Sequence, residues 1–366
     1  MKATTLAKID RKIRKLGILF PSKFLVSKYS RARLNFLKKL EEDIPKEIYY
    51  PPKEFSRILW GINFRSPIMN SAGMFKNGEC YEIVAKQGAA AYLGGTGTWN
   101  QRTGNEREGI YLPFIPYPRS HSSSNWLGLP NDGDKINSGK LSGLSRMLDC
   151  CIGWSVMGSP DLHDQDKLKF LVEGMKLYEK TGVDFIELNE SCPNTYHGKS
   201  QNEDLAKRLI YIKNNFLSQR SKKTPVIVKF SNDNEIQQVP AVMDLLFTLG
   251  YDGINFGNTS TDYEKRRNEI VESERKIYDF FTKTFGGGVS GKPLNESSLE
   301  LASKAVEYVK SGKPKQEFHV IRTGGIESKK DIEDSERAGI SLNQWFTGYF
   351  ENLSLYGHNL YRKLLE

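Results

Sequence analysis

The sequence predicts an α/β fold of the (β/α)8 TIM-barrel class with a helical extension at the N-terminus. Eight short apolar segments, each typical of a buried strand, alternate with segments whose apolar residues recur at helical spacing. The chain has 366 residues, which suits one barrel of roughly 250 residues plus an extension. A doubly wound open sheet would show the same alternation, but eight strands favour a closed barrel.

The candidate strands are short, and most are separated by helical patterns. The strands cover residues 67–70, 90–93, 151–156, 184–189, 225–230, 252–256, 318–322 and 341–346, and the helices cover residues 167–181, 204–215, 237–249, 296–309 and 329–338. Two long segments, residues 97–141 and 261–290, show neither pattern. Loops of that length in a compact domain are usually functional or disordered, so we expect them to fold over the barrel mouth.

Residues 1–50 form the predicted extension, and residues 51–366 form the barrel. Leu6, Ile9 and Ile13 recur at helical spacing among lysines and arginines, and a second helical pattern ends near Leu40. Much of the formal net charge of +9 lies in this arm. A basic amphipathic arm could lie on an anionic membrane surface through residues 1–45. The alternative is a helical pair packed on the barrel with its charges in water.

The composition is that of a folded protein from a reducing compartment. Charged residues make up 27% and hydrophobic residues 38%, which is not the composition of a disordered chain. The four cysteines (Cys80, Cys150, Cys151 and Cys192) form no CxxC pair and no zinc-ligand spacing. No apolar stretch approaches the ~20 residues that span a bilayer. We therefore expect a cytoplasmic protein, with at most peripheral membrane contact, and no metal site.

The richest chemistry follows the fourth candidate strand, in the run ELNESCPNT at residues 187–195. Asn189 and Asn194 carry amides that both donate and accept hydrogen bonds. Cys192, between them, can carry a proton on and off sulfur. This combination suits a planar, amide-like ligand beside an acid/base group. The alternative is a capped strand end with a structural cysteine.

Other strand ends carry small, polar or cationic residues. Lys229 ends the apolar run PVIVK, where a lysine is costly unless it meets a charge or a polar ligand. Lys76 follows the first strand within SAGMFKNGE. Glycine-rich runs, GGGVSGKPL at 286–294 and RTGGIES at 322–328, precede helices late in the chain. Such turns present backbone N–H groups to phosphate, which barrels often bind at this place.

In combination and in order, these four motifs resemble those of the dihydroorotate dehydrogenases, flavoproteins of pyrimidine biosynthesis. The resemblance runs from about Phe55 to the C-terminus. It implies FMN across the barrel mouth and dihydroorotate stacked on the flavin and oxidised to orotate. By this resemblance, Cys192 is the base that takes a proton from C5 while hydride leaves C6 for flavin N5.

The resemblance also assigns binding residues. It implies substrate contacts at Lys76, Asn125, Leu127, Gly128, Leu129, Asn189, Asn194, Asn258 and Thr259. It implies FMN contacts at Ala72, Gly73, Thr96, Asn189, Lys229, Ser290, Gly291, Gly324, Gly325, Phe346 and Thr347. Lys229 would favour the reduced flavin anion electrostatically. Arg322, which stands where the family usually has a small residue, is expected to contact the phosphate.

The motifs resemble two classes of this family at once. NESCPN and NWLGLPN resemble the soluble class, which has a cysteine base and passes electrons to fumarate or NAD. FKNGE, GGTGT, GGVSGKPL and the extension resemble the membrane-associated class that reduces quinones, although Gly257 stands where that class has threonine. We expect a quinone, because the arm could form a hydrophobic tunnel above the flavin.

The residues leave two other functions open. One is a related flavin enzyme acting on another pyrimidine, such as a free base or a tRNA uridine. The other is a basic barrel that binds nucleic acid without catalysis. The asparagines together with Lys76 favour a carboxylated ring over the first. A colourless protein that takes up no FMN would support the second, and we expect no nucleic-acid partner.

Overall fold

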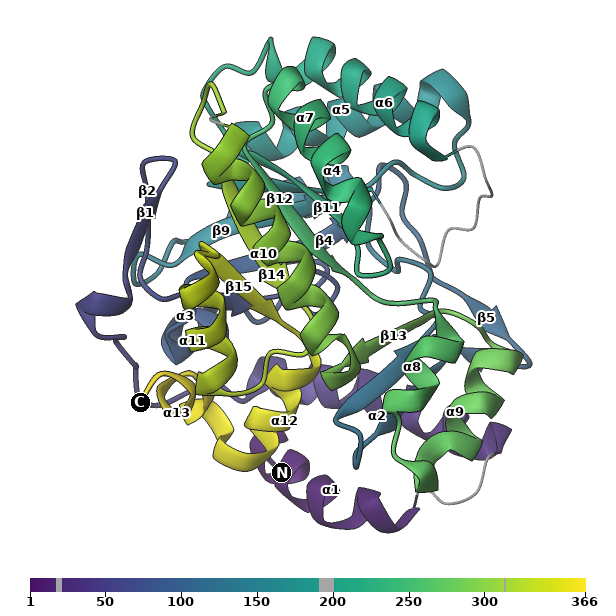
Figure 1. The fold of residues 1–366 in the computed structure, drawn as a ribbon. Helices are drawn as coiled ribbons and strands as arrows, with labels where there is room; N and C mark the ends of the chain where they lie inside the picture. Colours follow the sequence, from purple (N-terminus) through teal and green to yellow (C-terminus); the bar gives the residue numbers. More distant parts are fainter. Residues whose placement is uncertain (18–21, 191–200, 313) are drawn as a thin grey trace.

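A computed structural model describes residues 1–17, 22–190, 201–312 and 314–366, and its centre is a sheet of eight parallel strands (Figure 1). These strands are β3 (Ile68–Asn70), β4 (Ala91–Gly97), β9 (Cys151–Val156), β10 (Phe185–Asn189), β11 (Val226–Ser231), β12 (Gly253–Asn258), β14 (His319–Thr323) and β15 (Leu342–Trp345). Each strand overlaps a predicted one. The sheet curls into a nearly closed barrel, so the predicted fold class is confirmed.

The barrel is closed between β3 and β4 largely by one side chain. Asn70 Nδ2 donates to the Leu93 carbonyl at 2.7 Å, and the Leu93 N–H donates to Asn70 Oδ1 at 3.1 Å. The Ala90 N–H adds a bond of 2.9 Å to the Ile68 carbonyl. An amide side chain carries one donor group and one acceptor. Asn70 therefore supplies two hydrogen bonds to β4 in place of the backbone bonds that the short strand β3 does not make.

Helices surround the barrel. They are α3 (Tyr81–Gln87), α5 (Asp164–Thr181), α6 (Gln201–Ile212), α7 (Val239–Leu249), α10 (Asn295–Gly312), α11 (Lys329–Ala338), α12 (Thr347–Tyr356) and α13 (Leu360–Leu365). All five predicted helices are present. Local capping sets their ends: Ser328 and Asp331 form a capping box at the start of α11, and Gly339 ends that helix in the left-handed conformation.

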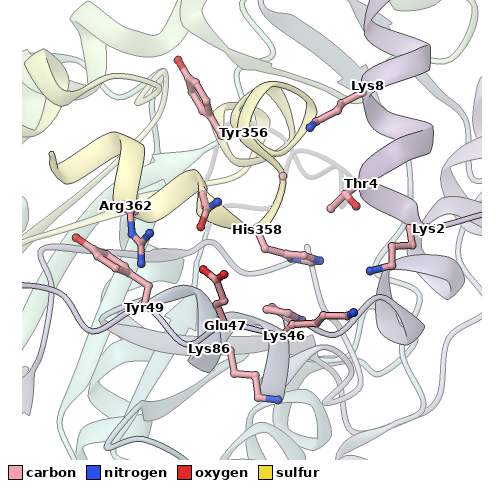
Figure 2. A pocket seen from close by; sticks show the side chains of 13 residues that line it. Lys2, Thr4, Lys8, Lys46, Glu47, Tyr49, Lys86, Tyr356, His358 and Arg362 are labelled. Atoms are coloured by element: carbon pink, nitrogen blue, oxygen red, sulfur yellow. The ribbon is translucent and has the colours of Figure 1, made fainter.

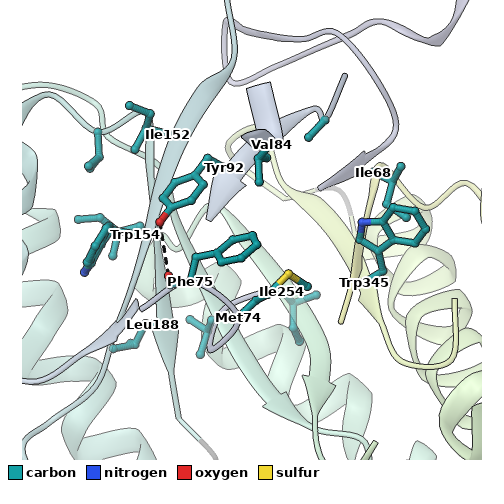
Figure 3. Packing of buried hydrophobic residues seen from close by; sticks show 14 of the residues in the cluster. Ile68, Met74, Phe75, Val84, Tyr92, Ile152, Trp154, Leu188, Ile254 and Trp345 are labelled. Atoms are coloured by element: carbon teal, nitrogen blue, oxygen red, sulfur yellow. Dashed lines mark hydrogen bonds between the residues drawn. The ribbon is translucent and has the colours of Figure 1, made fainter. Parts of the chain in front are cut away.

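The main hydrophobic core lies between the strands and these helices. Trp154 of β9 stacks on Tyr178 of α5, with ring centroids 5.1 Å apart. Gly94 of β4 makes room for this indole, since a Cβ there would lie 2.2 Å from the Trp154 ring. Figure 3 shows Phe75 stacked on Tyr92 in the same layer. The core thus fixes β4 and β9 relative to α5.

The inside of the barrel changes from apolar to polar along the strands. Phe185, Ile227, Ile321 and Leu342 form a buried apolar layer, which the hairpin of β1 (Arg57–Leu59) and β2 (Ile62–Phe64) covers with Leu59 and Phe64. Two residues further along the same strands stand Glu187, Lys229, Thr323 and Gln344. Because side chains alternate along a strand, these residues form the next inward layer, towards the mouth.

The two long segments are not the irregular loops that their sequences suggest. The first contains β5 (Glu106–Arg107), β6 (Ile110–Tyr111), β7 (Phe114–Tyr117), β8 (Ser122–Asn125) and α4 (Asp134–Ser142), and the second contains α8 (Tyr263–Glu269), α9 (Glu272–Thr284) and β13 (Gly288–Gly291). Strands β13, β8 and β7 pair into one antiparallel sheet. Strands of two to four residues are too short to show a period, and β8 and β13 consist largely of serine and glycine. The spacing of Ile277, Phe281 and Phe285 could have revealed α9.

The N-terminal arm consists of two helices, as predicted: α1 (Ala3–Gly17) and α2 (Lys23–Glu42). Arg14 of α1 binds both carboxylate oxygens of Glu351 on α12, at 2.6 and 2.7 Å, in a buried pair. Ser30 of α2 accepts a 3.0 Å bond from the Phe114 N–H of β7. The arm therefore packs beside α12 and the small sheet (Figure 1). Within the described part of the chain, no helix has both the length and the apolar character needed to cross a bilayer.

Candidate active site

Three of the predicted site residues form a chain of hydrogen bonds across the barrel mouth. Asn258 at the end of β12 donates through Nδ2 to Asn189 Oδ1 at 2.7 Å. Asn189 at the end of β10 donates through Nδ2 to Thr96 Oγ1 of β4 at 3.2 Å. Thr96 in turn shares a 3.0 Å bond with the Ser155 hydroxyl of β9. The amide of Asn189 is thereby held in one orientation.

Lys229 lies below this chain, inside the barrel. Its ammonium is 3.2 Å from Glu187 Oε1, 3.1 Å from Gln344 Oε1 and 3.5 Å from Ser71 Oγ. The residue is 2% exposed and Glu187 is 1% exposed. A charge pair this deep requires good geometry and additional hydrogen bonds. Lys229 therefore meets a charge and polar groups of the protein itself, and its contact with FMN stays a prediction.

The partners of Lys229 form a buried polar network that the sequence analysis did not find. Glu187 Oε2 accepts bonds from Gln344 Nε2 at 2.7 Å and from Asn255 Nδ2 at 3.1 Å. The Thr323 hydroxyl lies 3.0 Å from both Asn255 Oδ1 and Gln344 Oε1. Glu187, Thr323 and Gln344 each lie two positions beyond an inward apolar residue, so alternation along the strands could have found them. Lys229 was noted for a different reason, the cost of a lysine in an apolar run, and that reason did not extend to its partners.

Ser290 and Thr347 meet at the start of α12. Their hydroxyls are 3.0 Å apart, and the Ser123 hydroxyl of β8 is 2.9 Å from that of Ser290. Phe346 immediately precedes the helix. Hydroxyls at a helix N-terminus are suited to a phosphate group. The structure thus brings Ser290 to Phe346 and Thr347, which lie more than 50 residues further along the sequence.

The predicted glycines let chain segments meet closely at the mouth. Gly291 and Gly325 have positive φ, and Cβ atoms there would lie 2.3 Å from the His121 carbonyl oxygen and 2.5 Å from Asn295 Cα. Gly324 has a φ of +133°. Gly73 N–H donates to the Gly95 carbonyl at 2.7 Å, which ties the loop of Ala72 and Gly73 to β4. Side chains at these positions would push the segments apart.

The remaining substrate positions lie on loops around the mouth. Lys76 is in the loop after β3, where the carboxylate of Glu79 accepts its backbone N–H at 3.0 Å. Asn125 ends β8, and Thr259 directly follows β12. Leu127, Gly128 and Leu129 are anchored through their carbonyls, which accept bonds of 2.9, 3.1 and 2.9 Å from the Asn105 N–H, Arg102 Nε and Asn131 Nδ2.

Cys192 and Asn194 lie outside the described residues. The chain that leads to them is anchored at Glu190. Its N–H donates to the Lys229 carbonyl at 3.0 Å, and its carboxylate binds Arg208 Nε of α6 at 2.9 Å.

Comparison with known proteins identifies the family of this chain. A family model described as dihydroorotate dehydrogenase matches residues 55–365. The chain belongs to the dihydroorotate dehydrogenase family. Members of this family oxidise dihydroorotate to orotate in pyrimidine biosynthesis with FMN as their cofactor, and the chain is an oxidoreductase of this kind.

Individual relatives agree over most of the chain. Dihydroorotate dehydrogenase (quinone) of Aliivibrio salmonicida is 25% identical over 331 residues, which are 88% of this chain and 90% of the relative. The enzyme of the same name from Christiangramia forsetii is 24% identical over 343 residues, 91% and 92% of the two chains. A crystal structure of ligand-free dihydroorotate dehydrogenase from Eimeria tenella has a TM-score of 0.75 at 21% identity, covering 92% of this chain and 94% of that one. The structural likeness supports the fold.

The described residues suit the family's cofactor. Lys229 places a cation inside the barrel, below the hydrogen-bonded chain of Asn258, Asn189 and Thr96 at the mouth. The hydroxyls at the start of α12 suit a phosphate group. When bound, FMN supplies the hydride acceptor. The chain's own residues supply binding, orientation and charge.

Two departures from the family pattern have physical explanations. A Cβ at Gly257 would lie 2.4 Å from Thr323 Cβ, so Thr323 fills the space that a threonine at 257 would need. Arg322 is fully buried, and its guanidinium donates to Ser298 Oγ and to the carbonyls of Asn295 and Asp331 at 2.9 to 3.1 Å. The expected phosphate contact of Arg322 is therefore wrong, because its side chain joins β14 to α10 and α11.

Asp134 of α4, in the first long segment (residues 97–141), binds helix α5 of the barrel through a buried carboxyl group. It is 1% exposed, and its Oδ1 accepts a 2.7 Å bond from the Tyr178 hydroxyl of α5. Burial raises the pKa of Asp134 from 3.8 to about 7, although the bond from Tyr178 opposes this shift. The carboxyl group therefore holds its proton more tightly in the folded protein than in the unfolded chain.

We expect Asp134→Asn to remove a pH dependence of stability. The contribution of a group with a raised pKa is complete below the unfolded value of 3.8 and is lost as pH rises through about 7. In that window the parent should lose up to ~1.4 kcal/mol of unfolding free energy per pH unit relative to the variant. Urea denaturation at pH 5 and pH 8 measures this difference. If the parent and the variant differ in unfolding free energy by the same amount at both pH values, the prediction is wrong.

Proposed function

We propose that the chain passes the electrons of dihydroorotate through FMN to a quinone. The names of the two curated relatives, both quinone-type enzymes, support this acceptor. The observation that carries the proposal is a cavity of ≈ 440 Å³ between the N-terminal arm and the barrel mouth. A cavity of this size can bury much of a small organic ligand.

The lining of this cavity, which we name the arm cavity, favours a hydrophobic acceptor. Its apolar and aromatic walls include Leu6, Ala7, Tyr29, Phe36 and Phe350. At its inner end lie Phe346 and Thr347, the proposed FMN contacts. Five charged residues also line it: Arg14 and Glu351, which neutralise each other as a buried ion pair, and Asp10, Arg33 and Lys39. A quinone suits such walls better than the charged molecules fumarate and NAD.

The outer face of the arm supports peripheral membrane contact, which would bring a lipid-soluble quinone to the arm cavity. Ile9, Ile13 and Phe24 are 45%, 58% and 78% exposed. They lie on helices rich in lysine and arginine. Exposed apolar side chains beside basic ones are typical of helices that lie in the membrane interface.

The roles proposed at the substrate follow from the family resemblance and the geometry. Cys192 would take the proton from C5, and FMN, when bound, would supply the acceptor for the hydride from C6, so that the ring would lose one proton and one hydride. Asn189 and Asn258 offer amide groups to the pyrimidine edges, and their mutual bond of 2.7 Å orients them before substrate arrives. Lys76 is proposed to bind the substrate carboxylate.

An anaerobic titration tests the substrate and the cofactor together. Dihydroorotate should bleach the visible flavin band, and reoxidation should be fast with a quinone and slow with fumarate or NAD. Dihydrouracil lacks the carboxylate and should reduce the flavin poorly. Faster bleaching by dihydrouracil would favour a related enzyme of another pyrimidine. A protein that takes up no FMN would contradict the proposal altogether.

We expect Ala7→Trp to lower quinone reduction by roughly an order of magnitude or more, since an indole on this wall would occupy part of the arm cavity. Flavin reduction by dihydroorotate should be unchanged, because Ala7 is on α1, away from the barrel strands. Steady-state quinone assays and stopped-flow flavin reduction separate the two. Thr5→Trp is the matched control on the exposed face of α1. Equal quinone activity in both variants would exclude the arm cavity as the quinone site.

A further inference from the structure

A second cavity lies where the N-terminal arm, the linker after it and the C-terminal segment meet (Figure 2). Its volume is ≈ 310 Å³. It is lined by Lys2, Thr4, Lys8, Pro45, Lys46, Glu47, Tyr49, Lys86, Tyr356, Gly357, His358, Asn359 and Arg362. We name it the junction pocket. None of its residues belongs to the active site or to the arm cavity.

The junction pocket concentrates positive charge from four segments of the chain. Lys2, Lys8, Lys46, Lys86 and Arg362 line it, against one lining carboxylate, that of Glu47. Figure 2 shows these side chains arranged around a common space. Like charges that share a cavity repel one another, and this repulsion opposes folding. A bound anion would remove that cost.

Some of these cations are held in place by the protein. The Arg362 guanidinium lies over the Tyr49 ring, 5.1 Å from its centroid. Lys86 Nζ is 2.7 Å from Glu82 Oε1 of the same helix. Lys2 Nζ is 3.9 Å from Asp43 Oδ1. Fixed cations bind an anion at a lower entropy cost than free ones, so the pocket is partly preorganised.

His358 adds a neutral donor whose orientation is set by two neighbours. The Tyr349 hydroxyl donates to Gln87 Oε1 at 2.9 Å, so the other end of that amide, Nε2, donates to His358 Nδ1 at 3.0 Å. The proton of the neutral ring is therefore on Nε2. Burial lowers the pKa of His358, which favours this neutral form.

The Nε2 atom of His358 is buried and makes no hydrogen bond to the part of the chain that the structure describes. Asp43 Oδ1 is 3.7 Å away, beyond hydrogen-bond distance. The Tyr49 hydroxyl, in another wall residue, is likewise buried and unsatisfied among the described residues. Buried donors without partners are uncommon in folded proteins, and each calls for an explanation.

We infer that the junction pocket binds a phosphate group. A phosphate offers several acceptor oxygens and a charge of one to two, which matches cations converging with a neutral N–H donor. Its source is either an anionic phospholipid headgroup or a free phosphate compound. The pocket includes Lys8 of α1 and Lys2, which directly precedes this helix, and the exposed Ile9 and Ile13 of α1 would face lipid.

The double variant Lys8→Gln/Lys46→Gln tests this inference, because both lysines are exposed at the pocket rim and the variant should fold. The control is Lys265→Gln/Lys276→Gln, which removes the same charge from exposed positions on α8 and α9. The probes are phosphatidylglycerol vesicles in flotation, phosphatidylcholine vesicles as their neutral reference, and inorganic phosphate and pyrophosphate in calorimetry. FMN content and flavin reduction by dihydroorotate verify that both variants are intact.

We expect the pocket variant to bind its anionic probe roughly 30-fold more weakly than the control, because each cation removed near a surface costs about fivefold in affinity and the variant removes two. Loss confined to phosphatidylglycerol vesicles identifies a lipid headgroup. Loss confined to phosphate or pyrophosphate identifies a free phosphate compound. Equal binding by the pocket variant and the control to every probe, or no binding by the parent protein, would overturn the inference. Neither result depends on which acceptor oxidises the flavin.

Discussion

Replacing Cys192 with alanine should slow reduction of FMN by dihydroorotate by about 10²-fold or more, while FMN stays bound. General-base catalysis contributes about that much when the base is lost. Breaking the C5–H bond needs a group that accepts its proton, and alanine has none. Stopped-flow absorbance of the flavin band under anaerobic conditions measures the step without the acceptor.

The other cysteines make poor alternatives for this role. Cys80, Cys150 and Cys151 are buried. Burial raises the pKa of Cys150 to about 11 and that of Cys151 to about 12. Cys151→Ala is the matched control, because Cys151 begins β9 in the apolar layer, at the opposite end of the strands from the mouth. If Cys192→Ala reduces its flavin as fast as Cys151→Ala does, Cys192 is not the base.

The barrel was predictable because its strands repeat one pattern eight times. Buried parallel strands such as PVIVK are short apolar runs, and the helices between them show a different period. Polar residues at the ends of such strands converge at one mouth, so Asn189, Asn258 and Thr96 could be expected to meet. The structure adds which atoms bond, and therefore which way the Asn189 amide faces.

Other features depend on contacts between distant segments, which the sequence pattern does not reveal. The sequence places Asn70 at the end of a strand. Only the positions of β3 and β4 relative to each other show that its amide closes the barrel through two hydrogen bonds. The small sheet pairs Gly288 with Asn125, which lie in two insertions far apart in the chain. Arg322 faces outward, because the inward positions of β14 are taken by Ile321 and Thr323. Alternation along the strand could have shown this direction.

The second large effect is expected from Lys229→Met, which should destabilise the protein by about 3–5 kcal/mol. The variant leaves the Glu187 carboxylate buried at 1% exposure without the cation 3.2 Å away. Removing one partner of a buried ion pair typically costs this much. Urea denaturation should be measured on FMN-free protein, so that weaker FMN binding does not contribute to the difference in unfolding free energy.

The double variant Lys229→Met/Glu187→Gln separates the structural role of the pair from its role towards FMN. Glutamine removes the buried charge and keeps an oxygen for Asn255 Nδ2 and Gln344 Nε2, so most of the lost stability should return. The flavin midpoint potential should not return, because both variants lack the cation that favours the reduced anion. A midpoint potential equal to that of the parent protein would mean that the Lys229 charge does not influence the flavin. A double variant as unstable as Lys229→Met would mean that the ammonium stabilises the barrel through Ser71 and Gln344 rather than through Glu187.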